Sequence, residues 1–382
     1  MKKILWLPGW YPNRMDKFDG DFIQRHARAV SGFCNIHLVY VVKKDGSNSS
    51  TEVTVDRSPN LTEQIIYYKP VRTGIRSLDR FLSHWKYLSL HRKAIKEYIR
   101  KEGEPHCVHV HVALKTGLVA QWIKLKWNIP FIITEHWTGY LPEADDRLEY
   151  RSAIQLRQLV SSFREASAVT VVSDHLGKAI QKHFSFVEYK VIPNVVDVSV
   201  FYPTSSKPTD PLRLIHVSNM TYQKNPEAIM QALAILKRSG IPFQLECYGV
   251  IKPEIVSLTA TLGLNEQVIF KGEVTQPILA EAMRNAHALI LYSRFETFGC
   301  VIIEANACGV PVILSDIAAF HELVSAGTNG IFVKADDPIA LADAFIAFEK
   351  NRNQFDGEQI ARLAKASYSY QVVGEQFYSL YS

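Results

Sequence analysis

The sequence contains no apolar run that approaches the roughly 20 residues of a membrane-spanning helix, and it contains few cysteines. The five cysteines are odd in number and widely separated: Cys34, Cys107, Cys247, Cys300 and Cys308. Such a set argues against a disulfide framework and against a zinc site built on cysteine, and it is typical of reduced thiols in a cytosolic protein. The apolar part of the N-terminus is too short for a signal peptide and continues as a strand.

A second absence concerns glycine. No Gly-x-Gly-x-x-Gly follows a strand, which disfavours a dinucleotide-dependent oxidoreductase. The chain does have length and apolar content, since 382 residues with 47% hydrophobic content are enough for two domains. Its net charge of +5 is uneven, because residues 1–195 are clearly basic and the remainder is slightly acidic. This difference supports two domains and an anionic surface or acceptor for the first.

One stretch, from 294 to 316, carries the strongest pattern in the chain. Apolar residues 288–292 precede it and predict a buried strand, and residues 310–314 predict another. Between these strands, residues 300–308 form a short apolar helix that Gly309 and the proline two residues later bring to an end. In a unit of strand, loop, helix and strand, ligands bind beyond the carboxyl end of the first strand, at the N-terminus of the helix.

Two glutamates in this stretch need an explanation. Glu296 lies in the predicted loop and Glu304 in the predicted helix, about five residues after Gly299 and thus a rise of ~7–8 Å along it. Unpaired backbone amides at Phe298 and Gly299 favour an anion. A sugar, a diphosphate and a ribose in series fit this arrangement. The alternative is a surface loop glutamate with a polar helix residue, and the apolar neighbours of Glu304 disfavour it.

This pattern of Glu-x7-Glu, with Phe-Gly after the first glutamate and Ala-x-Ala-x-Gly-x-Pro-Val from Ala305, resembles the retaining GT-B glycosyltransferases of family 4 (group 1). The resemblance covers nearly the whole chain. It implies an α/β fold of two Rossmann-like domains, each with a parallel sheet, that face a cleft. It also implies a C-terminal helix that crosses back to the first domain.

The expected domains follow from the resemblance and from composition. Residues 1–200 form the acceptor-side domain, on which residues 366–382 pack back, and residues 201–365 form the domain that binds the nucleotide sugar. The segment 191–201 resembles the interdomain segment of the family, and the Ser-, Pro- and Thr-rich residues 203–211 read as a linker.

The resemblance also implies roles for individual residues. Glu296 would position the hydroxyls of the sugar, Glu304 those of the ribose, and His136 would lie beside the reacting carbon. Lys224 and the amides of the loop before the helix would meet the charge that grows on the departing diphosphate. The catalytic set is therefore Glu296, His136 and Lys224. The donor-binding set is Glu304, Phe298, Gly299, Thr297, Asn219, Gly20 and Asn194.

The chain departs from the family pattern in two places. Ser218-Asn219 stands where the family carries Gly-Arg, which leaves Lys224, the helix amides and a substitute base such as Arg294 to carry the charge of the leaving group. In the N-terminal loop, Gly20-Asp21 replaces the usual pair of glycines. Asp19-Gly-Asp21 also spells a metal-binding signature, but its position early in the chain disfavours that reading. No metal or cofactor is expected, since the nucleotide sugar is a substrate.

A strongly basic stretch with aromatic residues, 72–101, remains to be interpreted. It has two readings, an ordinary solvated helix face or a surface that binds an anionic membrane or a phosphate-bearing acceptor. No module that recognises nucleic acid is present. The second reading places the protein in the cytoplasm, at the inner face of the membrane.

Local patterns give three further expectations. His109 and His111 alternate with valines along a strand and are expected to be structural. Residues 44–60 are polar and predict a surface loop, and Asp174 is expected to cap a helix.

The favoured function is transfer of a hexose from a UDP- or GDP-sugar to a glycan or lipid-linked acceptor in bacterial polysaccharide or cell-envelope synthesis, with retention implied by the resemblance. One alternative is a sugar-nucleotide isomerase of the same fold, which would need no acceptor. The other is a non-catalytic protein that binds nucleotide sugars, which the missing arginine would suit.

Overall fold

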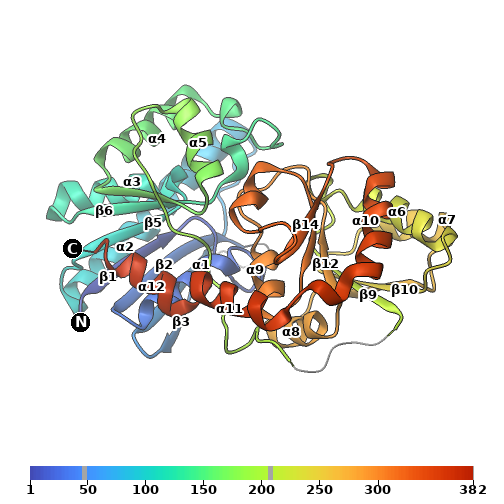
Figure 1. The fold of residues 1–382 in the computed structure, drawn as a ribbon. Helices are drawn as coiled ribbons and strands as arrows, with labels where there is room; N and C mark the ends of the chain where they lie inside the picture. The colour runs from blue at the N-terminus through green and yellow to red at the C-terminus, as the bar shows by residue number, and fades with distance from the viewer. Residues whose placement is uncertain (45–49, 205–209, 382) are drawn as a thin grey trace.

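Two predominantly parallel β-sheets, each packed between helices, lie side by side in the computed structural model (Figure 1). The structure describes residues 1–44, 50–204 and 210–381. The strand order is β3-β4-β2-β1-β5-β6-β7-β8 in the first sheet and β11-β10-β9-β12-β13-β14 in the second. The α/β fold of two sheet domains is therefore confirmed.

The strands match the apolar runs of the sequence closely. The first sheet consists of β1 (Lys3–Pro8), β2 (Asn35–Lys43), β3 (Glu52–Ser58), β4 (Leu61–Tyr68), β5 (Cys107–His111), β6 (Phe131–Glu135), β7 (Ala168–Val171) and β8 (Lys190–Val191). The second sheet consists of β9 (Leu212–Val217), β10 (Phe243–Tyr248), β11 (Val268–Gly272), β12 (Ala288–Leu291), β13 (Val312–Ser315) and β14 (Gly330–Val333).

Helices connect most of the parallel strands. In the first domain they are α1 (Asp21–Ser31), α2 (Arg76–Glu102), α3 (Ala113–Trp127), α4 (Ala153–Glu165) and α5 (Asp174–His183). The later ones are α6 (Pro226–Arg238), α7 (Pro253–Thr261), α8 (Gln276–Arg284), α9 (Cys300–Ala307), α10 (Pro338–Asn351), α11 (Gly357–Tyr368) and α12 (Tyr370–Tyr378). Short 3-10 turns span Thr138–Tyr140, Leu148–Tyr150, Tyr222–Lys224, Ala318–Glu322 and Arg352–Gln354.

Strand β1 shows how helices cover both faces of the first sheet. Ile4 and Trp6 point to one face and pack with residues of α1 and α12, whereas Leu5 and Leu7 point to the other and pack with residues of α2 and α3. Strands β5, β6, β12 and β13 are buried along their whole length. A parallel sheet with both faces covered explains why these strands are continuous apolar runs in the sequence.

The C-terminal helices return to the first domain, as the family resemblance implied. Helices α11 and α12 run from the second domain along the first, and the two chain ends lie on the same side of the molecule (Figure 1). Gly374 of α12 lies so close to α1 that a Cβ there would come within 2.6 Å of the Ala29 carbonyl oxygen. Beyond α12, the Tyr381 hydroxyl lies 2.6 Å from Nδ1 of His109 in the sheet.

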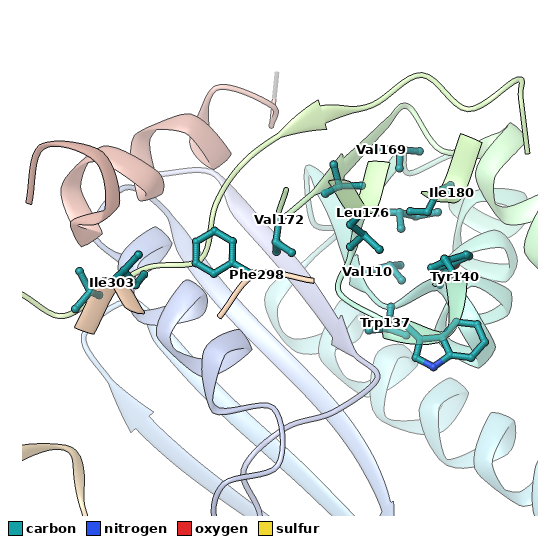
Figure 2. Close-up of a cluster of buried hydrophobic side chains, with 14 of the residues drawn as sticks. Val110, Trp137, Tyr140, Val169, Val172, Leu176, Ile180, Phe298 and Ile303 are labelled. Carbon is teal, nitrogen blue, oxygen red and sulfur yellow. The ribbon is translucent and has the colours of Figure 1, made fainter. Parts of the chain in front are cut away.

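Apolar side chains and hydrogen bonds also join the two domains directly. Phe298 and Ile303 of the second domain belong to the same buried cluster as Val172 and other residues of the first (Figure 2). The Ser173 hydroxyl donates to the Thr297 carbonyl at 2.6 Å. These contacts fix the loop before α9 against the first domain.

Two local expectations were wrong. Residues 52–58, expected within a surface loop, form β3, which pairs antiparallel with β4. Its side chains are almost all exposed because it is an edge strand, so it lacks the apolar signal of the others. Residues 45–49 lie outside the described residues. The cap of α5 is Ser173, whose hydroxyl accepts from the Leu176 amide, and Asp174 is the first residue of the helix.

Candidate functional site

A cleft of about 690 Å³ lies between the two domains, at the carboxyl ends of β1, β6, β9 and β12. Loops after these strands supply its walls, as expected for ligand sites in open parallel sheets. All ten residues proposed from the sequence line this cleft: Gly20, His136, Asn194, Asn219, Lys224, Glu296, Thr297, Phe298, Gly299 and Glu304. They come from segments up to 284 positions apart, so the fold brings a dispersed set together.

Gly299 shapes the start of α9. Its φ of +99° lies in the left-handed region, and a Cβ there would lie 3.0 Å from Ile302 Cδ1 and 3.1 Å from Phe320 Cε1. Glycine is therefore required for the sharp turn from the loop into the helix. The Ile302 amide donates to the Gly299 carbonyl at 3.0 Å, whereas the first amides of an α-helix have no acceptor within it. Those first amides of α9 and the helix dipole form a site for an anion.

Glu296 is buried and held by its own domain. One carboxylate oxygen accepts from the Ser293 hydroxyl at 3.0 Å and pairs with the Lys224 ammonium, and the other accepts from Gln223 Nε2 at 3.2 Å. Only 6% of the residue is exposed. This support fixes the direction of the carboxylate at the edge of the cleft.

Arg294 does not substitute for the missing arginine. Its Nη1 donates to the Tyr222 carbonyl at 2.6 Å, its Nε lies 3.1 Å from Asp336 Oδ1, and its guanidinium stacks on the Tyr222 ring. These partners hold it outside the cleft lining. The expectation for this residue was wrong because sequence proximity to Glu296 did not determine the direction of its side chain.

The second glutamate has a partner from the other domain. Glu304 forms a buried ion pair with Nη1 of Arg25 in α1, and Nη2 of Arg25 lies 3.2 Å from Asp21 Oδ2. Burial disfavours the charge on Arg25, but the carboxylates of Asp21 and Glu304 outweigh this effect and raise the pKa of the guanidinium. Arg25 thus stays charged, and sequence reasoning missed it.

His136 follows β6 and is part of a cluster of buried histidines. Its Nε2 lies 3.1 Å from Nδ1 of His111, and the His26 ring centroid lies 5.6 Å away. Burial, reinforced by the neighbouring imidazoles, lowers the pKa of His136 well below its usual value. The ring therefore enters the cleft as a neutral group that stays neutral at physiological pH.

These three histidines are also the one group with metal-ligand proximity found in the part of the chain that the structure describes. One nitrogen from each ring lies within 4.8 Å of the other two, and several ring nitrogens make no hydrogen bond. Ligands of a tetrahedral zinc ion at 2.0–2.1 Å would lie about 3.4 Å apart, so the rings would have to move closer to hold one. The carboxylates of the Asp-x-Asp sequence face different partners, Tyr40 for Asp19 and Arg25 for Asp21.

The remaining proposed residues provide polar groups and backbone shape. Gly20 has a φ of +62°, and a Cβ there would come within 2.6 Å of the Trp10 backbone. The buried Asn194 Oδ1 accepts no hydrogen bond from the described residues, which leaves it free for a ligand. Asn219 Oδ1 accepts from the Thr221 hydroxyl at 3.1 Å. Glu273 and Val274, in the loop between β11 and α8, also line the cleft.

Family models match both halves of the chain. Residues 202–369 match the model described as Glycosyl transferases group 1, and residues 37–200 match the model described as Glycosyltransferase Family 4. The change from one model to the next lies between β8 and β9, where the chain passes from the first sheet to the second.

Over the aligned residues, curated relatives are about a quarter identical to the chain. An uncharacterized glycosyltransferase from Methanocaldococcus jannaschii is 27% identical over 62% of this chain and 64% of its own length. D-inositol 3-phosphate glycosyltransferase 1 from Catenulispora acidiphila is 27% identical over 65% of each. The chain thus spans slightly less than two thirds of the length of these relatives.

Solved structures with the same fold cover the chain more fully. Sucrose-phosphate synthase from Thermosynechococcus elongatus aligns with a TM-score of 0.80 at 21% identity, covering 100% of this chain and 98% of its own. HepE from Anabaena, solved in complex with UDP-glucose, aligns with a TM-score of 0.72 at 16% identity, covering 100% and 99%. At these identities the likeness concerns the fold.

Proposed function

Because the chain belongs to the glycosyltransferases of group 1 and family 4, we propose that it transfers a hexose from a nucleoside-diphosphate sugar to a hydroxyl of a glycan or lipid-linked acceptor. The observation that carries this proposal is the convergence of Glu296, Lys224, Glu304 and the start of α9 in one cleft. The spacing of these groups suits a sugar, a diphosphate and a ribose bound in series.

The chemistry requires the bond between the anomeric carbon and the diphosphate oxygen to break. The diphosphate leaves with the bonding electron pair, and its growing charge meets the amides at Gly299 and the Lys224 ammonium. Lys224 pairs with Glu296 at the edge of the cleft, and both side chains are placed to meet the donor. Glu296 accepts hydrogen bonds from the hydroxyls of the sugar, and the neutral His136 ring borders the anomeric carbon.

Retention at the anomeric carbon follows if the acceptor hydroxyl attacks from the face that the diphosphate leaves. Its proton then passes to an oxygen of the departing phosphate, so no protein base is required for the transfer. Closure of the cleft between the two domains excludes water, which would otherwise compete with the acceptor. No metal or cofactor has a part in this scheme.

UDP- and GDP-sugars are the proposed donors. HepE, of the same fold, was solved with UDP-glucose, and this supports a uridine donor. A thermal-shift screen with UDP, GDP and ADP and their sugars tests the proposal, because a ligand that binds the folded state raises the melting temperature. Failure of every nucleoside diphosphate to stabilise the protein would contradict it.

The same screen leads to an assay that separates the alternatives. Slow release of free sugar from the stabilising nucleotide sugar, without acceptor, is the result expected of a transferase. Conversion into an isomeric nucleotide sugar would instead indicate an isomerase, and tight binding with neither hydrolysis nor transfer would indicate a binding protein.

Helix α2 is the proposed surface for the acceptor side. Its start presents Leu78, Phe81 and Trp85 at helical spacing, with Phe81 57% and Trp85 52% exposed, and several exposed basic residues flank them: Arg72, Arg76, Arg80, Lys93, Lys96 and Arg100. Apolar and aromatic side chains within a basic helix suit the surface of an anionic membrane. No helix among the described residues is both long and apolar enough to cross one. This surface favours a lipid-linked acceptor of polysaccharide or cell-envelope synthesis. It would place the protein at the cytoplasmic face of the membrane.

Vesicle co-sedimentation tests the surface. The protein is expected to bind vesicles that contain phosphatidylglycerol more strongly than vesicles of phosphatidylcholine alone. The double variant Phe81→Ser, Trp85→Ser is expected to lose most of this binding, whereas Leu125→Ser, which removes an exposed apolar side chain on α3, serves as the control. Equal binding by both variants would contradict the assignment to α2.

A further inference from the structure

We infer that Arg25 is a positioning residue that makes the cleft receptive to a diphosphate, in place of the arginine that the loop after β9 lacks. The inference rests on the proposed function. Among the described residues that line the cleft, Arg25 and Lys224 are the two with a lasting positive charge. Lys224 belongs to the second domain, whereas Arg25 reaches the site from α1 of the first.

The contacts of Arg25 cross from one domain to the other. Its Nη1 pairs with Glu304 Oε1 in α9, and its Nη2 lies 3.2 Å from Asp21 Oδ2 in its own helix. Arg25 is 2% exposed and Glu304 4%, so water screens this ion pair little. The guanidinium charge also opposes the rise in pKa that burial causes for the thiol of Cys300, the first residue of α9. Arg25 therefore lies beside the helix start where the diphosphate is proposed to bind.

The charges around this helix start explain why Arg25 is needed. Asp21 and Glu304 both line the cleft, and both carboxylates lie against the Arg25 guanidinium. Burial raises the pKa of Glu304, and the charge of Arg25 opposes that effect. Without the guanidinium, the carboxylates of Asp21 and Glu304 would face an incoming diphosphate with no cation between them, and like charges repel. Arg25 removes that repulsion without removing the carboxylate that binds the ribose.

One N–H donor of Arg25 makes no hydrogen bond with the described residues. A guanidinium has five N–H groups in a fixed plane. In Arg25 the two terminal nitrogens hold the carboxylates, while the buried Nε–H finds no acceptor among the described residues. A lysine could not satisfy two carboxylates and still present a further charged donor in that plane. The guanidinium of Arg25 thus holds both carboxylates and still carries one unpaired, buried N–H.

Two substitutions with opposite expected effects test the inference. The measured quantity is the ratio of affinities for the nucleoside diphosphate and for the matching nucleoside, determined by calorimetry on the full chain. Arg25→Met is expected to weaken binding of UDP or GDP at least tenfold while changing binding of uridine or guanosine less than threefold. Asp21→Asn, which removes one of the two carboxylates and keeps the pair with Glu304, is expected to tighten diphosphate binding about threefold.

Because the two variants are expected to change diphosphate affinity in opposite directions, the test still decides if one of them folds poorly. Arg25→Met leaves Glu304 buried and unpaired, so its folding is checked by circular dichroism, whereas Asp21→Asn leaves that ion pair intact. A ratio that is unchanged in Asp21→Asn, or in folded Arg25→Met, would overturn the inference while the proposed function stands. A wild-type protein that binds none of the nucleoside diphosphates would instead remove the proposed function and the inference together.

Discussion

The two glutamates of the cleft show how residues of the same type acquire different tasks. Glu296 is surrounded by donors from its own domain, among them Ser293 and Gln223. Glu304 is held by an arginine from the other domain. The first is thus held within the second domain, and the second joins the two domains.

Glu296→Gln and Lys224→Met are each expected to lower transferase turnover by about two orders of magnitude. The first keeps the shape of the side chain but loses the charge that orients the sugar and Lys224, and the second removes a cation that faces the leaving group. Steady-state kinetics with the donor found by the screen measure the effect. Turnover within a factor of three of the wild type in both variants would contradict the assignment.

Arg294→Met is the matched control for Lys224→Met. It also removes a positive charge near Glu296 in the sequence, but the side chain points to Tyr222 and Asp336 and away from the cleft. Turnover is expected to stay within about threefold of the wild type. A loss as large as that of Lys224→Met would show that Arg294 reaches the donor after all.

Three of the residues found from the sequence share a local signal, and Arg25, which was missed, has none. Glu296, Gly299 and Glu304 lie within nine positions, so their spacing alone predicts a common site. Arg25 acts on Glu304, 279 positions along the chain, and no local pattern connects the two. Its spacing of four from Asp21 is that of an ordinary ion pair on a helix surface.

Helix α9 places the anion site, and Gly299 determines how that helix begins. Gly299→Ala is expected to destabilise the protein by about 1–2 kcal/mol, since a left-handed conformation is costly for a residue with a Cβ and Ile302 and Phe320 crowd the position. Urea unfolding measures the loss, and weaker binding of the nucleoside diphosphate is expected to accompany it. Wild-type values for both would show that the turn tolerates a side chain.

Helix α12 stabilises the first domain by covering α1. Gly374→Val would place a side chain against the Ala29 carbonyl and the Phe33 ring, so we expect a loss of about 1–3 kcal/mol in the free energy of unfolding, as for other overpacked positions. Glu375→Ala, at the exposed neighbouring position, is the control and is expected to change little. Equal stability of the two variants would contradict the close packing of α12 on α1.

At the element scale the sequence predicted buried strands well and exposed ones poorly. β12 and β13 were predicted to within two residues of their observed ends, because apolar runs bounded by polar or turn residues are typical of buried strands. β3 carries polar side chains on both faces at the edge of the sheet, and its composition could not be told from that of a loop.

Across the whole molecule, burial of histidine makes stability depend on pH. Six fully buried histidines have lowered pKa values because burial disfavours the charged ring: His26, His91, His109, His111, His136 and His216. Below a pKa of about 6.5, the unfolded chain binds protons that the folded protein does not. Glu135, whose pKa burial raises to about 7, acts in the opposite direction between about pH 4.5 and 7.

Burial also raises the pKa values of Glu304 and Asp19, which act in the same direction as Glu135. The free energy of unfolding is still expected to fall as the pH drops from 6.5 toward 4, because the six histidines outnumber these three carboxyl groups. Each buried histidine contributes at most about 1.4 kcal/mol per pH unit. Urea unfolding at pH 7 and pH 5 measures the change. His91→Leu, which removes the ring whose pKa burial lowers to about 4, is expected to reduce the difference between the two conditions. A midpoint that is equal or higher at pH 5 would contradict this account.

The most direct test of the whole account is a crystal structure of the protein with its nucleoside-diphosphate sugar. We expect the diphosphate within hydrogen-bond distance of the amides at Gly299 and Cys300, the sugar hydroxyls on Glu296, and the ribose toward Glu304. A donor bound outside the cleft between the two sheets, or a Glu296 carboxylate turned away from the sugar, would contradict the central claim.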